Sequence, residues 1–417
     1  MSHLKSFTIY ASTTFFNAAV SFATFSILTH HLNEVDYGII NLYNSFLIFL
    51  VPFVSAGVQF TLSVDYFKMG KQAYTHHFKN SVIIPLFSCL LFTAVCVVFS
   101  PHISSFIGVA LPYVWVLPLL CLITTLSDIL LNLVRNREQH YLFAGISAAK
   151  NVFEIGFTIL FVVLLGQHWE GRINSNIITL VVLLAAIIFF LKRWGLFSGR
   201  YDSNALKRIF FLSLPFIPER LAIFILGYSD RFFINYYEGT DDVGYYSAGA
   251  QIAIMVNLVC LTLANTFHPV LFKRLSANEI DYRAVRKACY SYLLISLSVA
   301  IATILLTPVI FEVFIGRSFQ PGQQYAVNLV IGFFFWSVYN LFLGFLLNHK
   351  RNKAIMNISL VSMGLSLVLN LVLVRYFGAL GATYTNIIVY TLMAAISLYL
   401  VSRHYSLKRI FWQPLES

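Results

Sequence analysis

The sequence predicts an all-α integral membrane protein in which 12 transmembrane helices form two six-helix bundles with a parallel internal repeat. Three observations support this fold class. Of the 417 residues, 59% are hydrophobic and only 11% are charged, whereas a soluble protein carries more than twice that charge fraction. Apolar runs recur from one end of the chain to the other. Short motifs of the first half return, in the same order, in the second half.

Each apolar run is about long enough for a helix to cross a bilayer. A transmembrane β-barrel would instead give alternating segments of about ten residues. The first run has no convincing cleavage site and continues to Leu28, so we interpret it as a retained helix rather than a signal peptide. The expected spans are residues 6–30, 38–64, 80–100, 113–134, 142–166, 175–193, 208–234, 244–268, 288–311, 325–348, 354–375 and 381–402. Pro or Gly is expected to break the apolar run at 101–112 and 376–380.

The basic residues predict an orientation. With the N-terminus placed inside the cell, 22 of the 28 Lys and Arg residues lie in inward segments and four lie in outward segments. This excess alternates loop by loop, which is the positive-inside pattern. Both termini are therefore expected in the cytoplasm. The net charge of +11 is interpreted as a topology signal, so no nucleic-acid partner is expected.

The repeat predicts two lobes of like orientation, an N-terminal six-helix lobe at residues 1–200 and a C-terminal one at 201–417. Six spans per repeat is an even number, so the pseudo-twofold axis should run along the membrane normal with a central cleft between the lobes. The matched motifs are Asp36-Tyr-Gly38 with Asp242-Val-Gly244, Ser100-Pro101 to Gly108 with Thr307-Pro308 to Gly316, and Gly171 to Asn176 with Gly381 to Asn386.

The sequence does not indicate an enzyme. It has no nucleotide-binding glycine loop, no zinc-protease motif and no serine-hydrolase motif in a supporting context. The five cysteines lie scattered in apolar runs, so neither a metal site nor a disulfide framework is indicated. No extramembrane segment is long enough to hold a domain. No cofactor is expected, and transport energy should come from an H⁺ or Na⁺ gradient, a partner, or removal of the substrate on the far side.

Ionisable residues inside the predicted spans are the strongest candidates for function, because charges in hydrocarbon need a partner or a watery cavity. The expected cavity cations, which would attract an anionic head group, are Lys150 and Arg220. The expected acids, which would balance these cations or carry a coupling ion, are Asp128, Glu154, Glu219 and Asp230. Uncharged polar residues of the first half add Asn17, Asn41 and Asn44.

A structural interpretation remains open for the same residues. Lys150 and Glu154 are spaced i, i+4 and could form an internal ion pair on one helix. Glu219 and Arg220 could lock helices together in the same way. Asp230 and Arg231 are expected near the outer interface, where a local ion pair is the favoured interpretation. Pro215 and Pro218 flank Glu219 and favour a bend in the seventh span.

Several motifs together resemble the Wzx-type polysaccharide flippases of the MOP superfamily, which also contains multidrug MATE exporters and the lipid II flippase. The motifs are Leu32-Asn-Glu-Val-Asp-Tyr-Gly38, Leu214-Pro-x-x-Pro218, Ser229-Asp-Arg-x-x-Ile234, Val243-Gly-Tyr-Tyr-Ser247 and Gly378-Ala-Leu-Gly-Ala382. With the span count, the resemblance covers essentially the whole chain. It brings no catalytic set that could be carried over, so the candidate site residues rest on the residues themselves.

The resemblance implies two six-helix bundles in a MATE-like V shape that work by alternating access. The implied cargo is an undecaprenyl-diphosphate-linked oligosaccharide, a unit of O-antigen or a related surface polysaccharide, moved from the cytoplasmic to the periplasmic leaflet of the bacterial inner membrane. Implied partners are this glycan, membrane lipids and other membrane proteins of polysaccharide assembly.

Two alternative functions remain open. A MATE-like exporter of cationic drugs should have acidic residues dominating its cavity, whereas here Lys150 and Arg220 accompany the acids. A polysaccharide polymerase should have a long outward loop with catalytic Arg or His, and no such loop is evident.

Overall fold

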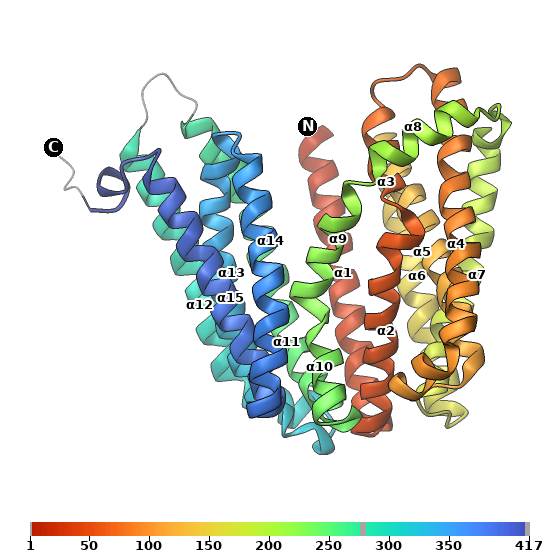
Figure 1. The fold of residues 1–417 in the computed structure, drawn as a ribbon. Helices are drawn as coiled ribbons and strands as arrows, with labels where there is room; N and C mark the ends of the chain where they lie inside the picture. The colour runs from red at the N-terminus through yellow and green to blue at the C-terminus, as the bar shows by residue number, and fades with distance from the viewer. Residues whose placement is uncertain (1, 276–280, 413–417) are drawn as a thin grey trace. The chain divides into compact units, whose positions relative to one another are not determined.

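The computed structural model describes residues 2–275 and 281–412, without the side chains of residues 2–8, 11 and 412. All regular structure in these ranges is helical (Figure 1). The chain divides into two compact units, Met1–Phe224 and Ile225–Ser417, which we call unit 1 and unit 2. The predicted lobes divide the chain at residue 200, whereas the compact units divide it inside helix α9. The intervening helix α8 belongs to unit 1 because it packs on α3 and α4.

Unit 1 is a helical bundle whose main pairs are α4 with α5, α2 with α5, α1 with α6 and α6 with α7. Asn33 caps α2, where its side chain accepts a hydrogen bond from the Asp36 amide at 2.7 Å. The helices are α1 (Ser2–His31), α2 (Glu34–Ser55), α3 (Val58–Asp65), α4 (Lys71–Ile107), α5 (Leu111–Asn136), α6 (His140–Thr158), α7 (Trp169–Arg193), α8 (Ser203–Ser213) and α9 (Phe216–Tyr228), with short segments η1 (Ile159–Leu164) and η2 (Leu196–Ser198).

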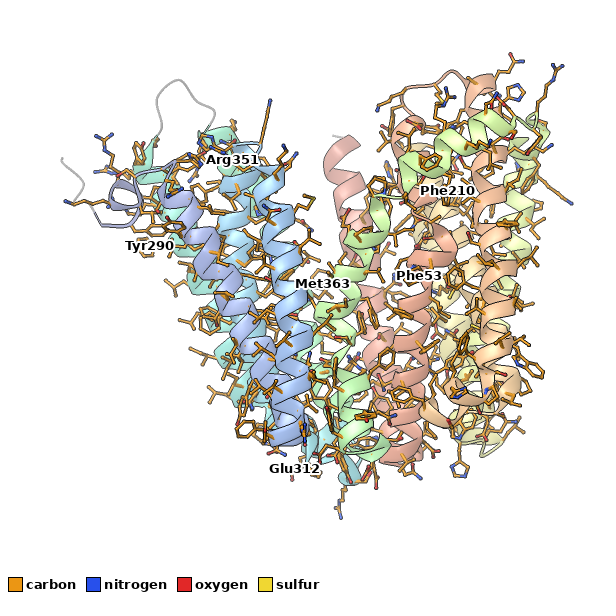
Figure 2. All side chains as sticks on the ribbon, viewed as in Figure 1. Phe53, Phe210, Tyr290, Glu312, Arg351 and Met363 are labelled. Atoms are coloured by element: carbon orange, nitrogen blue, oxygen red, sulfur yellow. The ribbon has the colours of Figure 1, made fainter. Side chains whose placement is uncertain are left out.

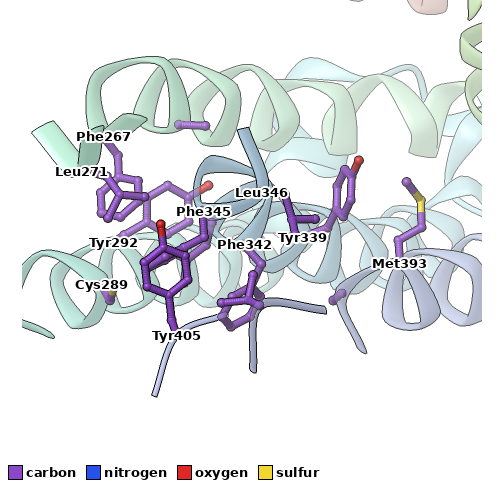
Figure 3. Packing of buried hydrophobic residues seen from close by; sticks show 14 of the residues in the cluster. Phe267, Leu271, Cys289, Tyr292, Tyr339, Phe342, Phe345, Leu346, Met393 and Tyr405 are labelled. Carbon is purple, nitrogen blue, oxygen red and sulfur yellow. The ribbon is translucent and has the colours of Figure 1, made fainter. Parts of the chain in front are cut away.

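Unit 2 is built around α13, which packs on α11, α12 and α15. Figure 3 shows aromatic side chains from α11, α12 and α13 meeting in its core, among them Phe267, Tyr292 and Phe345. The helices are α10 (Asp230–Tyr237), α11 (Thr240–Leu275), α12 (Tyr282–Phe314), α13 (Gly322–Asn348), α14 (Asn352–Leu369) and α15 (Arg375–Ser402), with short segments η3 (Arg317–Phe319), η4 (Asn370–Val374) and η5 (Lys408–Trp412).

Ten helices in the described ranges are long and apolar enough to cross a membrane. One of them, Asn352–Ser402, contains both of the last two predicted spans, which a turn at Gly378 separates. Helix α1 forms where the first span is expected but is not among the ten. The chain is a multi-pass membrane protein, and the predicted count of 12 spans is plausible rather than exact. Residues 276–280, between the eighth and ninth predicted spans, lie outside the described residues.

The repeated motifs occupy equivalent places in the two units. Pro101 lies inside α4 and Pro308 inside α12, each one to two turns before the helix ends. A π-helical segment lies in the last part of the fifth and eleventh predicted spans, η1 in unit 1 and η4 in unit 2. The break between the third and fourth spans is shorter than the predicted one at 101–112. Helix α4 continues to Ile107, because a proline inside a membrane helix is tolerated where the freed backbone groups find other partners.

The second and seventh predicted spans are broken rather than continuous. Ala56 and Gly57, with φ of 47° and 75°, separate α2 from α3, and Leu214-Pro215 separates α8 from α9. A Cβ on Gly57 would lie 2.7 Å from the Ser213 carbonyl oxygen. The hydroxyls of Thr61 and Ser213 are 3.2 Å apart, so the two breaks pack against each other within unit 1.

Buried thiols are a further feature of both units. Cys89, Cys96 and Cys121 are buried in unit 1, and Cys260 and Cys289 in unit 2. All five are free, as their scattered places in apolar runs predicted.

Candidate functional site

The clearest polar contact inside unit 1 joins α6 to α7. The Arg172 guanidinium donates to Glu154 at 2.5 Å and to the Thr158 hydroxyl at 3.0 Å. The two charged side chains are only 16% and 17% exposed, so each charge is largely withdrawn from solvent. Glu154 therefore has its ion pair with a residue of the next helix. The i, i+4 pair of Glu154 with Lys150, which the spacing allowed, is not among the ion pairs of the described residues.

Lys150 lies between two acids and forms no ion pair with any described residue. It is half-buried on α6, one turn before Glu154. Its charge attracts both Glu154 and Asp128 of α5. Asp128 is exposed although its helix neighbours Ser127 and Ile129 are buried. An ammonium group placed in this way can still take an anionic ligand.

Arg220 of α9 is the second cation that acts on Asp128. Its charge also attracts the Asp128 carboxylate, and its guanidinium carbon lies 4.3 Å from the centre of the Phe60 ring. This stacking fixes the guanidinium by a cation–π contact. Its Nε atom is buried without a hydrogen-bond partner. The neighbouring Glu219 is exposed and has no ion pair with a described residue.

These contacts give a row of alternating charges in unit 1. We call it the charged row, and it consists of Arg220, Asp128, Lys150, Glu154 and Arg172. The row draws on α9, α5, α6 and α7. Three cations against two acids leave an excess of positive charge, and the guanidinium and ammonium groups suit phosphate oxygens. The structure thus brings together four of the six predicted site residues, Lys150, Arg220, Asp128 and Glu154.

A pocket lies beside one end of the charged row, between α2 and α7. It is a small recess, with room for about one water molecule (about 10 Å³), and is partly open to solvent. Arg172, Asn44 and Asn176 line it together with Tyr43. Amide and guanidinium groups of this kind bind hydroxyl-rich ligands through hydrogen bonds.

Arg172 precedes the predicted span 175–193 and is one of the four cations expected in outward segments, so its part in the site was not predicted. The repeated motif that begins at Gly171 was the signal that could have found it. Asn176 of that motif lines the pocket, and its counterpart Asn386 donates to the Tyr246 hydroxyl in unit 2 at 3.2 Å.

Asp230, the remaining predicted acid, lies in unit 2. Its carboxylate accepts from the Arg231 guanidinium at 3.1 Å and from the Tyr246 hydroxyl. Asp230 and Arg231 are 5% and 4% exposed, and the guanidinium also faces the Tyr228 and Tyr246 rings. The expected local ion pair is thus present, but it is buried within unit 2 and held by residues of α10, α11 and α15.

In the described part of the chain, no group of three or more His, Cys, Asp or Glu residues is placed to hold a metal ion. The charged row offers cations and amides instead. The arrangement suits electrostatic binding of an anion.

Two family models match the chain. The model described as polysaccharide biosynthesis protein matches residues 3–275. The MatE model matches residues 215–372.

Curated relatives are similar to parts of the chain. "Lsg locus putative protein 1" of Haemophilus influenzae is 25% identical over 212 residues, covering 49% of this chain and 53% of the relative. The "Putative O-antigen transporter" of Shigella flexneri is 25% identical over 166 residues, covering 40% of this chain and 39% of the relative. The chain therefore matches about half or less of the length of these two relatives.

The fold has a solved counterpart. The inward closed conformation of the lipid II flippase MurJ superposes with a TM-score of 0.73 at 14% sequence identity, covering 96% of this chain and 88% of that chain. At this identity the likeness establishes the fold.

Proposed function

The chain belongs to the polysaccharide biosynthesis protein family, and from this premise we propose that it flips an undecaprenyl-diphosphate-linked oligosaccharide across the bacterial inner membrane. Its family and its O-antigen-transporter relative agree with the resemblance to Wzx-type flippases of the MOP superfamily. The proposed cargo is a unit of O-antigen or a related surface polysaccharide, carried from the cytoplasmic to the periplasmic leaflet.

The charged row is the observation that supports this cargo best. A diphosphate and a glycan cannot cross hydrocarbon unaided, since each unpaired polar group costs several kcal/mol there. Lys150, which forms no ion pair with a described residue, and Arg220, which is fixed on Phe60, would hold the diphosphate. The amides of Asn44 and Asn176 would receive sugar hydroxyls in the nearby pocket. The prenyl tail would stay in lipid.

The mechanism we propose is alternating access without covalent chemistry, so the protein would act as a transporter and not as an enzyme. Asp128 and Glu154 would release their cationic partners to the phosphates of the substrate, or would bind a coupling H⁺ or Na⁺. Flipping in vesicles should then respond when a proton or sodium gradient is imposed. Equal rates with and without both gradients would remove the coupling role of these acids.

Loss of cavity charge tests the proposed function directly. We expect Lys150→Ala and Arg220→Ala each to lower surface polysaccharide about tenfold or more in a complemented deletion strain, because one strong charge-assisted contact is worth about 1.5–3 kcal/mol. Polysaccharide would be measured on intact cells, alongside the amount of protein in the membrane.

Two controls separate charge from folding in this experiment. Arg220→Lys keeps the charge that the alanine variant removes. Lys192→Ala removes an exposed cation at the end of α7. Both controls should leave far more polysaccharide than Lys150→Ala and Arg220→Ala do. Wild-type levels from Lys150→Ala and from Arg220→Ala would refute the cationic site.

A MATE-like exporter is the second candidate, and the MatE match over residues 215–372 favours it. It predicts that a deletion strain becomes sensitive to cationic drugs while its surface polysaccharide stays intact. The opposite pattern, normal drug tolerance with accumulated lipid-linked units on the inner leaflet, is expected for the flippase.

A further inference from the structure

A second cationic feature lies in unit 2, at the ends of three membrane-crossing helices. The turn between α13 and α14 carries His349, Lys350 and Arg351, and the residues after α15 are Arg403 and His404. All five side chains are exposed. We call these five residues the basic platform. They directly flank the apolar helices Gly322–Asn348 and Asn352–Ser402, so they belong at the membrane–water interface, where lipid phosphates lie.

The two chain segments are packed together. The His349 and His404 rings have centroids 5.0 Å apart. Tyr405 is 8% exposed and lies beneath them, with its ring 4.9 Å from His349 and 5.3 Å from Phe345. Its hydroxyl accepts a hydrogen bond from the Asn348 side chain at 3.0 Å. The platform is thus held by the core of unit 2.

No described acid forms an ion pair with the platform, and Asp281, the acid at the start of α12, is engaged as the N-cap of that helix. From residue 313 to residue 415 the sequence contains neither Asp nor Glu. Glu312, the last acid before this stretch, lies at the opposite end of unit 2 from Arg351 in Figure 2. The described charges that act on His404 are all cationic, namely Arg351, His349 and Arg403. The positive-inside pattern requires only that these loops be basic. It does not explain why two loops hold their like charges side by side.

We propose that the basic platform binds the phosphate of an anionic phospholipid headgroup. Guanidinium groups from two loops can share one phosphate, since each presents a fork of donors. The bound phosphate would offset the repulsion among Arg351, Arg403 and the histidine pair. A headgroup is favoured over free phosphate because the platform adjoins apolar helix ends, where an acyl chain can remain in the membrane.

The histidines give the platform a dependence on pH. Loss of hydration, together with the charges of Arg351, His349 and Arg403, lowers the pKa of His404 below its usual value. A bound phosphate opposes this effect and favours the protonated ring. Binding should therefore strengthen as the pH falls from 8 to 6, and the double variant His349→Gln/His404→Gln should lose that dependence.

The test measures lipid retained by the full chain, purified in detergent, by native mass spectrometry with phosphatidylglycerol and with phosphatidylcholine. We expect Arg351→Gln/Arg403→Gln to weaken phosphatidylglycerol binding roughly thirtyfold or more, because the two guanidinium groups share one phosphate and loss of a charge-assisted contact alone lowers affinity more than tenfold. The matched control Lys192→Gln/Arg193→Gln removes the same charge from exposed residues at the end of α7, and should bind like the wild type.

Three outcomes would overturn the proposal. The first is equal loss of lipid in the platform and control variants, and the second is equal retention of the two lipids by the wild type. The third is displacement of phosphatidylglycerol by millimolar inorganic phosphate, which would assign the platform to free phosphate instead. A thermal unfolding curve of each variant without lipid verifies that the fold is intact.

Discussion

Glu154 and Arg172 show how a single contact can combine structural and functional roles. They are 18 residues apart in the chain and meet across the turn between α6 and α7. Removing one partner leaves the other charge largely buried and unpaired, which costs more than the pair itself contributes. Arg172 also lines the pocket, so its side chain links the charged row to the place proposed for the sugar.

We therefore expect Arg172→Ala to destabilise the protein by about 2 kcal/mol, because a buried carboxylate loses its charge-assisted hydrogen bond. Glu154→Gln/Arg172→Gln, in which neither charge remains, should recover most of that loss. Thermal unfolding in detergent measures both effects. If the double variant is less stable than the single one, the pair is not the source of the penalty.

At the scale of helices, α11 and α13 approach each other through glycine. A Cβ on Gly249 would lie 2.5 Å from the Gly322 carbonyl oxygen, and a Cβ on Gly322 would lie 2.6 Å from the Tyr245 carbonyl oxygen. Small residues at such a crossing let two membrane helices pack backbone to backbone. This contact holds the start of α11, and with it Tyr246, against the start of α13.

Gly249→Leu should push these helices apart and lower the unfolding temperature by several degrees, as a loss of about 1–3 kcal/mol from overpacking would do. Gly364→Leu is the matched control, because no atom lies within 4 Å of a Cβ at that position of α14. An unchanged unfolding temperature for Gly249→Leu would show that the crossing can relax at little cost.

Helix breaks mark the limit of what the sequence could predict at this scale. Hydropathy located the spans, since each must shield its backbone from lipid. It did not reveal that Ala56-Gly57 splits the second span, because the apolar run continues across the break. Nor did it reveal the partner of Glu154. Spacing along one helix suggested Lys150, whereas the observed partner stands on the next helix.

At the scale of the whole molecule, the repeat could be predicted from the sequence, because its motifs mark helix ends and occur in the same order in both halves. The fold that they predicted is the fold of the lipid II flippase, despite 14% sequence identity. The identity of the cargo is a different matter, since it depends on a few polar side chains whose neighbours come from separate helices. The sequence could suggest Lys150 and Arg220 as candidates, but only the structure shows that the charges of both act on Asp128.

The orientation of the whole chain remains a prediction, and reporter fusions test it. A fluorescent protein joined after Ser417 should be bright, and alkaline phosphatase joined there should be inactive, because both termini are expected in the cytoplasm. Alkaline phosphatase joined after Arg317, in the turn before α13, should be active. An active phosphatase at the C-terminus would reverse the predicted topology.

The five buried cysteines make the natural chain a ready background for spectroscopy. Each thiol is shielded by packed side chains, so a membrane-impermeant maleimide should find no native target in the folded protein. A cysteine introduced at an exposed position, such as Glu219 in unit 1 or Asn352 in unit 2, would then react alone. Spin labels at these two positions would test the alternating access that we propose, with every native residue of the core still in place.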